Sequence, residues 1–277
     1  MVAEYAGFCF GVKRAVDIAI KNRENKDGST HTLGPLIHND DVVNYLKGQG
    51  IAQIRIEDLS KLGKEDKVVI RSHGVTPETI KLIEETGAKT IDATCPYVAS
   101  IQRKIKRYYS KGYQIIIVGD ADHPEVEGIN GWCDNRALVT KNGENIKSLS
   151  EKVCIVAQTT ERQENFDNVV KRASDLSEDI LAFNTICSAT KERQESADQV
   201  SKRVDLMIVI GGKHSSNSRK LYDICKGNCR NTIFIENGKE LKDYILDSEA
   251  IGSIGVTAGA STPDWVIDDI LTILKSG

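Results

Sequence analysis

The chain has 277 residues, of which 40% are hydrophobic and 28% are charged, the balance of a globular protein with a sizeable core. Its net charge of −3 argues against a nucleic-acid partner, because such binding domains are usually strongly basic. No apolar run approaches the roughly 18–20 residues that span a bilayer, and no signal peptide is visible, so we expect a cytoplasmic protein without a membrane partner. Seven cysteines, an odd number, argue against a disulfide framework and favour metal or redox roles.

The first predicted elements are a short strand that ends at Cys9 and an amphipathic helix that follows at once. Apolar residues recur in this helix at helical spacing, namely Val12, Ala15, Val16, Ala19 and Ile20. A thiol at a helix N-terminus lies at the positive end of the helix dipole, which favours the thiolate. Taken alone, however, such a cysteine is more often a small packing residue at a strand end.

The corner at Cys9 recurs twice, because a strand, a cysteine and a helix also follow one another at Cys95 and at Cys187. Cys9 and Cys95 are 86 residues apart, Cys95 and Cys187 are 92 apart, and 90 residues follow Cys187. We call these three the corner cysteines. The repeat predicts three similar α/β units, with residues 1–94, 95–186 and 187–277.

Polar residues end further strands at matching distances from the corner cysteines. A second strand in each unit ends 28 or 29 positions later, at His38, His123 and Ser215. A later strand ends 64 or 74 positions after the cysteine, at His73, Thr159 and Ser261. Each of these residues alone is more often a structural turn or helix cap. Their equivalent offsets in three units favour one joint site.

Apolar strands that alternate with helices predict parallel sheets buried on both faces. Helix starts are predicted at Thr76–Pro77 and, through a capping box, at Thr160 with Gln163. Ligands of such sheets bind beyond the carboxyl ends of the strands. If the three units form a trefoil about a pseudo-threefold axis, the corner cysteines meet at its centre. The segment 1–9 either pairs in the first sheet or completes the third.

Three thiolates from distant segments can hold zinc or an iron–sulfur cluster with one open iron. No corner cysteine has a near cysteine neighbour, which disfavours a zinc knuckle, and the C-x2-C-x2-C run of ferredoxins is absent. An open iron acts as a Lewis acid toward a substrate oxygen. Of the other cysteines, Cys133 and Cys154 are expected to pack in the core. Cys225 and Cys229 either pack as well or form a second metal site.

The polar residues predict the class of substrate. Hydroxyl, amide and imidazole groups near helix N-termini suit a phosphate or diphosphate, and they include Ser216, Asn217 and Thr160 beside the residues above. Glu125 is the one carboxylate in this set. Beside an anionic cluster its pKa is expected to rise, which suits a proton donor. The basic run at residues 103–107 is most simply a solvated helix face.

Nine sequence blocks together resemble the 4-hydroxy-3-methylbut-2-enyl diphosphate reductase family, also called LytB, over nearly the whole chain. They are FCFGV (8–12), GPLIHN (34–39), RSHG (71–74), DATCP (92–96), HPEVEG (123–128), AQTT (157–160), NTIC (184–187), SSNS (215–218) and TAGAS (257–261). The resemblance implies a trefoil of three α/β units around one [4Fe–4S] cluster held by Cys9, Cys95 and Cys187. It implies two one-electron reductions of an allylic diphosphate, in which the substrate hydroxyl at the open iron leaves as water.

The resemblance also implies the roles of the polar residues. It assigns the diphosphate to His38, His73, Ser215, Ser216, Asn217 and Ser261. Glu125 delivers protons, with Thr159 in its hydrogen-bond network, and His123 binds substrate or joins the proton relay. Ferredoxin or flavodoxin is the implied electron donor, and isopentenyl and dimethylallyl diphosphate are the implied products.

Two alternatives remain open at this point. Quinolinate synthase also places one cysteine on each of three repeated units around a cluster, although the blocks at 123–125 and 215–217 favour the reductase. A zinc-stabilised binding module without chemistry is the alternative of a different class. Stoichiometric zinc without iron or sulfide in anaerobically purified protein would identify it.

Overall fold

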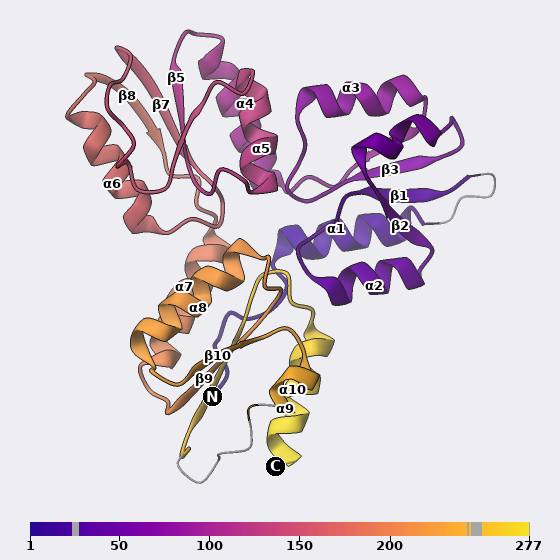
Figure 1. The fold of residues 1–277 in the computed structure, drawn as a ribbon, viewed down its shortest axis with the longest axis vertical. Helices are drawn as coiled ribbons and strands as arrows, with labels where there is room; N and C mark the ends of the chain where they lie inside the picture. The colour runs from indigo at the N-terminus through magenta and orange to yellow at the C-terminus, as the bar shows by residue number, and fades with distance from the viewer. Residues whose placement is uncertain (24–27, 243, 245–250, 277) are drawn as a thin grey trace. The chain divides into compact units, whose positions relative to one another are not determined.

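A computed structural model describes residues 1–23, 28–242, 244 and 251–276. In this part of the chain there are three parallel sheets, each flanked by helices (Figure 1). The chain forms two compact units. The smaller unit comprises Met1–Lys13, His38–Val42 and Ser188–Gly277, and the larger unit comprises Arg14–Ile37 and Val43–Cys187.

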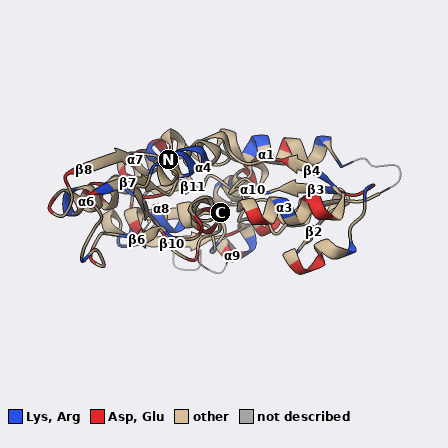
Figure 2. Ribbon diagram, turned by 90° about the horizontal axis from the view of Figure 1, so that it is seen from above, with Lys and Arg blue, Asp and Glu red and all other residues tan. Residues whose placement is uncertain are grey.

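The first sheet lies in the larger unit and has the strand order β2-β1-β3-β4, with all neighbours parallel. Its strands are β1 (Thr30–Leu33), β2 (Ile51–Ile54), β3 (Lys67–Ile70) and β4 (Lys89–Asp92). The accompanying helices are α1 (Phe10–Lys21), α2 (Asp40–Gly48), the 3-10 helix η1 (Ile56–Lys61) and α3 (Pro77–Thr86). The unit boundary falls inside α1 and α2. Helix α3 carries three glutamates and one lysine, and its acidic residues are drawn in red in Figure 2.

The second sheet also belongs to the larger unit and repeats the same order, β6-β5-β7-β8, again entirely parallel. Its strands are β5 (Gln114–Val118), β6 (Leu138–Thr140), β7 (Lys152–Ala157) and β8 (Asp179–Phe183). The helices are α4 (Pro96–Tyr109), α5 (Pro124–Asn130), the 3-10 helix η2 (Gly131–Cys133) and α6 (Gln163–Ser174). Each equivalent strand therefore occupies the same place in both sheets.

The third sheet lies in the smaller unit, with the parallel order β10-β9-β11. Its strands are β9 (Leu206–Ile210), β10 (Thr232–Ile235) and β11 (Ile254–Ala258). The helices are α7 (Ser188–Ser201), α8 (Ser216–Asn228), α9 (Gly238–Lys242) and α10 (Asp264–Ser276). The opening segment 1–9 accompanies this sheet, because Val2 forms a parallel bridge to Val256 and Gly7 donates its N–H to the Ala258 carbonyl. The prediction of a strand that ends at Cys9 is wrong, since this segment makes only that isolated bridge.

Successive side chains of the central strands point to opposite faces of the sheet, and helices cover both faces. In β5, Ile115 and Ile117 pack against α4 and α5, whereas Ile116 and Val118 pack against α6 on the opposite face. The third sheet is covered in the same way, with α10 on one face and with α7 and α8 on the other. Figure 1 shows this layering around the second sheet. The expectation of three α/β units with parallel sheets buried on both faces is thereby confirmed.

The two predicted helix starts have different outcomes. Thr76 caps α3 by accepting the Thr79 N–H at 3.1 Å, with Pro77 in the first turn, as predicted. The capping box at Thr160 is wrong, because α6 begins at Gln163 after Arg162, while the Thr160 hydroxyl accepts a hydrogen bond from Gln158 Nε2. None of the helices described is both long and apolar enough to span a bilayer. The trefoil placement and the three unit boundaries stay predictions.

Candidate functional site

The carboxyl ends of parallel strands carry the predicted site residues, because side chains beyond these ends face the same edge of a sheet. In the larger unit, His73 follows β3 and Cys95 follows β4. In the second sheet the corresponding residues are His123 with Glu125 after β5, Thr159 after β7 and Cys187 after β8. In the smaller unit, Ser215 follows β9 and Ser261 follows β11.

The corner cysteines have matching backbone environments. The Cys95 N–H donates to the Ser72 carbonyl at 2.9 Å, and the Cys9 N–H donates to the Ala260 carbonyl at 3.1 Å. The Cys187 N–H donates to the Thr159 carbonyl at 3.1 Å. The backbone at each corner cysteine is therefore joined by one hydrogen bond to the loop that follows a neighbouring strand. A helix starts directly after each cysteine, with Pro96 at the start of α4.

The side chains of the corner cysteines differ from those of the other four. All three are half-buried, whereas Cys133, Cys154, Cys225 and Cys229 are buried. Burial raises the pKa of the Cys133 thiol to about 11 and that of the Cys154 and Cys225 thiols to about 12. Metal ligation requires a thiolate. Only the corner cysteines thus combine accessibility with a helix N-terminus, so this donor set fits a cluster with three protein ligands.

Cys225 and Cys229 pack in the apolar core between the third sheet and helices α7 and α8. Their thiols point to backbone carbonyls, with Cys229 Sγ at 3.4 Å from the Asn231 oxygen and Cys225 Sγ at 3.9 Å from that of Ala197. No third potential ligand joins them among the described residues. The packing interpretation of these two cysteines holds.

Glu125 and Thr159 form a buried polar pair in the larger unit. Thr159 donates its N–H to Glu125 Oε1 and its hydroxyl to Oε2, both at 2.6 Å. Glu125 is only 2% exposed and Thr159 is 7% exposed. Such charge-assisted bonds at a buried carboxylate fix its position and keep it close to a group that can relay a proton. The predicted association of these two residues is present.

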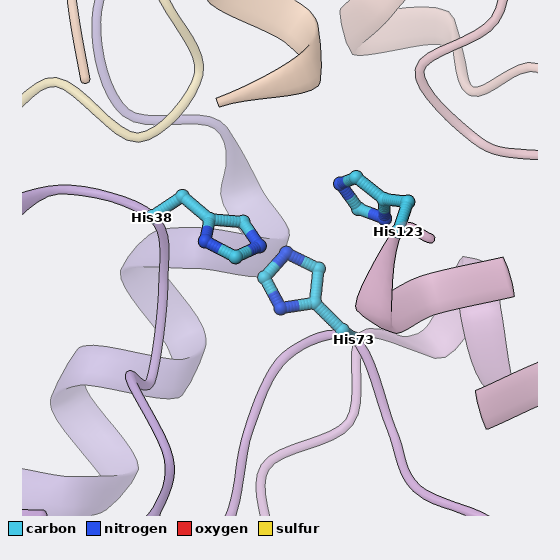
Figure 3. A group of neighbouring side chains, drawn as sticks. All are labelled: His38, His73 and His123. Atoms are coloured by element: carbon cyan, nitrogen blue, oxygen red, sulfur yellow. The ribbon is translucent and has the colours of Figure 1, made fainter. Parts of the chain in front are cut away.

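His123 caps the helix that carries Glu125. Its Nδ1 accepts the Glu125 N–H at 3.1 Å, so the proton of the neutral ring is on Nε2. The rings of His73 and His123 are 5.4 Å apart and meet edge to face at 82° (Figure 3). Two strand ends of the larger unit, β3 and β5, thus bring their histidines together. His38, drawn in the same figure, belongs to the smaller unit.

The smaller unit gathers hydroxyl and amide groups at the N-terminus of α8. Ser215 caps this helix by accepting the Ser218 N–H at 3.3 Å, and Ser216 and Asn217 form its first turn. Asn217 is 4% exposed, yet neither its Oδ1 nor its Nδ2 has a hydrogen-bond partner among the residues that the structure describes. A buried polar side chain usually has partners, so this amide is suited to a ligand.

Ser261 and His38 meet in the smaller unit. The Ser261 hydroxyl donates to the His38 carbonyl oxygen at 3.3 Å. A side chain at Gly212 would collide with that carbonyl, because an added Cβ would lie 2.5 Å from its oxygen. The segment 38–42 therefore sits directly on the loop that precedes α8. Five predicted substrate ligands share this unit, namely His38, Ser215, Ser216, Asn217 and Ser261.

Two buried residues with positioning roles were missed by sequence reasoning. Gln158, which is fully buried, accepts the Asp120 N–H and donates to the Thr160 hydroxyl, both at 3.0 Å. Arg193 on α7 donates to the Gly7 oxygen at 2.8 and 3.1 Å and to the Phe8 oxygen at 3.2 Å, and thereby holds the backbone just before Cys9. The AQTT block contained the first residue. Nothing in the sequence distinguishes the second from a solvated helix arginine.

Comparisons with known proteins agree with these features. The family model described as "LytB protein" matches residues 1–275. A Clostridium perfringens (strain SM101) protein named "4-hydroxy-3-methylbut-2-enyl diphosphate reductase" is 51% identical over 99% of this chain and 98% of its own. A Clostridium tetani protein of the same name is 53% identical, and the chain spans only 42% of that relative's length.

Two solved structures are also similar. A reductase structure described as "the Terminal Enzyme of the Non-Mevalonate Pathway" is 40% identical, with a TM-score of 0.73 and 100% of this chain and 99% of that chain covered. A Plasmodium falciparum diphosphate reductase structure is 25% identical, with a TM-score of 0.89 and 99% of this chain and 87% of that chain covered.

Proposed function

We propose that this chain, which belongs to the LytB family, reduces 4-hydroxy-3-methylbut-2-enyl diphosphate to isopentenyl and dimethylallyl diphosphate. Two electrons and two protons are consumed for each substrate, and the allylic hydroxyl leaves as water. The observation that carries the proposal is the set of three equivalent corner cysteines, together with the buried Glu125–Thr159 pair. A cytoplasmic location, with ferredoxin or flavodoxin as donor, is part of the proposal.

Cys9, Cys95 and Cys187 would hold one [4Fe–4S] cluster. The donor set supports this assignment, because three accessible thiols at helix N-termini contrast with four buried ones. When bound, the cluster supplies electrons one at a time and an open iron as a Lewis acid. The chain's own residues do the rest, by binding the diphosphate and moving protons.

Proton delivery is assigned to Glu125. Its Oε1 is held by the Thr159 N–H, so Oε2 is the oxygen that exchanges a proton with the Thr159 hydroxyl across 2.6 Å. With Oε2 protonated, the bond reverses, and the Thr159 hydroxyl can then donate its own hydrogen to the substrate. His123, whose neutral ring carries its proton on Nε2, either shares this relay or binds the diphosphate.

Diphosphate binding is assigned, as the family resemblance implies, to His38, His73, Ser215, Ser216, Asn217 and Ser261. The N-terminus of the 13-residue helix α8 offers backbone N–H groups and the positive dipole end to an anion. The Asn217 amide, which is buried and has no hydrogen-bond partner in the described part of the chain, supports the assignment most directly. Asn217→Ala is expected to raise KM more than it lowers kcat, because it removes binding and not proton transfer.

The test is turnover by anaerobically purified protein, with dithionite and a viologen as reductant. Iron and sulfide analysis and EPR spectra, with and without the substrate diphosphate, accompany it. Zinc near stoichiometry without iron or sulfide would contradict the cluster, and turnover of quinolinate precursors would favour the synthase alternative. Cys95→Ser should lower the iron content, whereas Cys133→Ala, which changes a buried cysteine, should retain it.

A matched pair of carboxylates tests the proton donor. Glu125→Gln should keep the cluster and lower turnover about 100-fold or more, the usual contribution of a general acid. Glu127→Gln alters an exposed carboxylate two residues further along α5 and should keep turnover near normal. Near-normal turnover of Glu125→Gln would remove Glu125 from its assigned role.

A further inference from the structure

Helix α4 is the one α-helix in the part of the chain that the structure describes that carries basic residues and no acidic residue. Its basic residues are Arg103, Lys104, Lys106 and Arg107, and Lys111 follows just beyond its end. Arg103, Lys106, Arg107 and Lys111 are exposed, and Lys104 is half-buried. We call these five residues the α4 patch; Figure 2 marks its charges in blue. The α4 patch thus gathers five positive charges in a chain whose net charge is −3.

The cations of the α4 patch rest on aromatic rings. Lys104 Nζ lies 5.8 Å from the centre of the Phe183 ring, and Lys106 Nζ lies 5.5 Å from that of Trp132. Arg107 and Lys111 lie over the Tyr108 ring, at 5.6 and 5.8 Å. None of the five pairs with a carboxylate within the described chain. Aromatic faces orient a cation without neutralising it, so the positive field stays directed outward.

Helix stability alone does not account for this composition. Basic residues in the last turn, Lys106 and Arg107, complement the negative end of the helix dipole. Arg103 and Lys104 lie before that turn, and Arg103 repels Lys106 and Arg107 at spacings of three and four residues. A patch that carries repulsion without internal counter-charges is typical of a surface that meets an acidic partner.

The α4 patch is connected to a proposed cluster ligand through its own helix. Cys95 is the residue directly before α4, and its carbonyl accepts the Ala99 N–H at 2.9 Å. Tyr97, in the first turn, is 47% exposed. The helix of 14 residues is about 21 Å long, so the four basic residues within it lie less than one helix length from Cys95. A protein bound over α4 would therefore be close to the proposed redox centre.

We propose that the α4 patch is the docking surface for the electron donor, a small carrier protein with an acidic face that gives up one electron per encounter. The inference rests on the proposed function. Two encounters oxidise two carriers by one electron each, and these two electrons with two protons convert one allylic alcohol into one alkene and water. A nucleic acid is the less suitable polyanion, because the rest of the chain is acidic overall and would repel it.

The test measures binding of reduced ferredoxin, and separately of flavodoxin, to the anaerobic cluster-loaded protein at low and high salt. The variant Arg103→Gln/Lys106→Gln/Arg107→Gln removes three charges from the α4 patch. The matched control, Lys81→Gln/Lys147→Gln/Lys171→Gln, removes three exposed lysines of the same unit outside the patch. The patch variant should bind the carrier about tenfold more weakly at low salt, and high salt should erase the difference.

Turnover gives a second measurement. For the patch variant, the ratio of carrier-driven to dithionite-driven turnover should fall about tenfold, whereas the control should keep both rates. Equal losses in both variants, no loss in the patch variant, or a wild type that binds neither carrier would overturn the docking surface. Loss of RNA binding with carrier binding intact would also overturn it. Absence of any dithionite-driven turnover would refute the proposed function, while the binding titration would still decide the docking surface.

Discussion

Replacement of Thr159 by valine removes one hydroxyl from the buried Glu125–Thr159 pair and leaves the side-chain shape nearly unchanged. The lost bond joins Thr159 Oγ1 to Glu125 Oε2 over 2.6 Å, while the backbone bond to Oε1 remains. Hydrogen bonds to a charged group contribute about 1.5–3 kcal/mol when both partners are buried. Thr159→Val should therefore lower the free energy of unfolding by about 2 kcal/mol.

Thr159→Ser is the matched control, because it keeps the hydroxyl and loses only a methyl group, at about 0.8 kcal/mol. Urea unfolding of anaerobic protein measures both variants, alone and combined with Glu125→Gln, in a double-mutant cycle. The coupling energy between Thr159→Val and Glu125→Gln should exceed about 1 kcal/mol, since the two residues bond directly. Turnover should follow the hydroxyl, being retained by serine and lost with valine.

Equal destabilisation by serine and valine, together with a coupling energy below about 0.5 kcal/mol, would refute the reasoning. The hydroxyl would then neither hold the carboxylate in place nor stand as its proton relay. Glu125 would in that case be held by the Thr159 backbone N–H alone.

Three further predictions concern cysteines, a surface carboxylate and two glycines. In cluster-free protein at pH 8, an alkylating reagent should modify the corner cysteines and spare Cys133 and Cys154, because burial raises the pKa of these two thiols to about 11 and about 12. Rapid labelling of Cys133 and Cys154 in a peptide map would contradict this prediction. The Asp66 carboxylate accepts hydrogen bonds from the Gly63 and Ser29 N–H groups and from the Ser29 hydroxyl, which lower its pKa from 3.8 to about 2. The ionised carboxylate therefore stabilises the folded protein above pH 3.8, and this contribution is lost as the pH falls through about 2. Asp66→Asn should thus cost about 1 kcal/mol at pH 7, after allowance for solvent screening, and almost nothing near pH 2 in urea titrations; a cost independent of pH would count against it. Gly74→Ala should lower the free energy of unfolding by more than about 2 kcal/mol, because φ is +70° and the added Cβ collides with the buried Gln102. Gly87→Ala, with φ +77° but only the flexible Lys64 side chain nearby, should cost about 1 kcal/mol. Equal shifts of the melting temperature in the two variants would contradict the collision at Gly74.

Much of the fold was readable from local patterns. Alternating apolar runs such as Ile115–Val118 report a strand buried on both faces, because successive side chains point to opposite sides of a sheet. Repetition carried the site prediction further, since equal offsets from the corner cysteines are a linear feature that requires no knowledge of contacts. The Thr76–Pro77 helix start was likewise local and was confirmed.

Only the tertiary structure decided which polar groups satisfy one another. By sequence the Thr160 hydroxyl fits a capping box. In the structure it accepts a hydrogen bond from the side-chain amide of the buried Gln158, and the helix begins later, at Gln163. Arg193 lies 186 positions from Gly7 and still holds the backbone of the Cys9 corner. The sequence alone determined the three corners and the residue types around them, because strand, turn and helix signals act over a few residues. Burial and hydrogen-bond partners join residues far apart in the chain, so the pairing of Glu125 with Thr159 at 2.6 Å was settled by the folded structure.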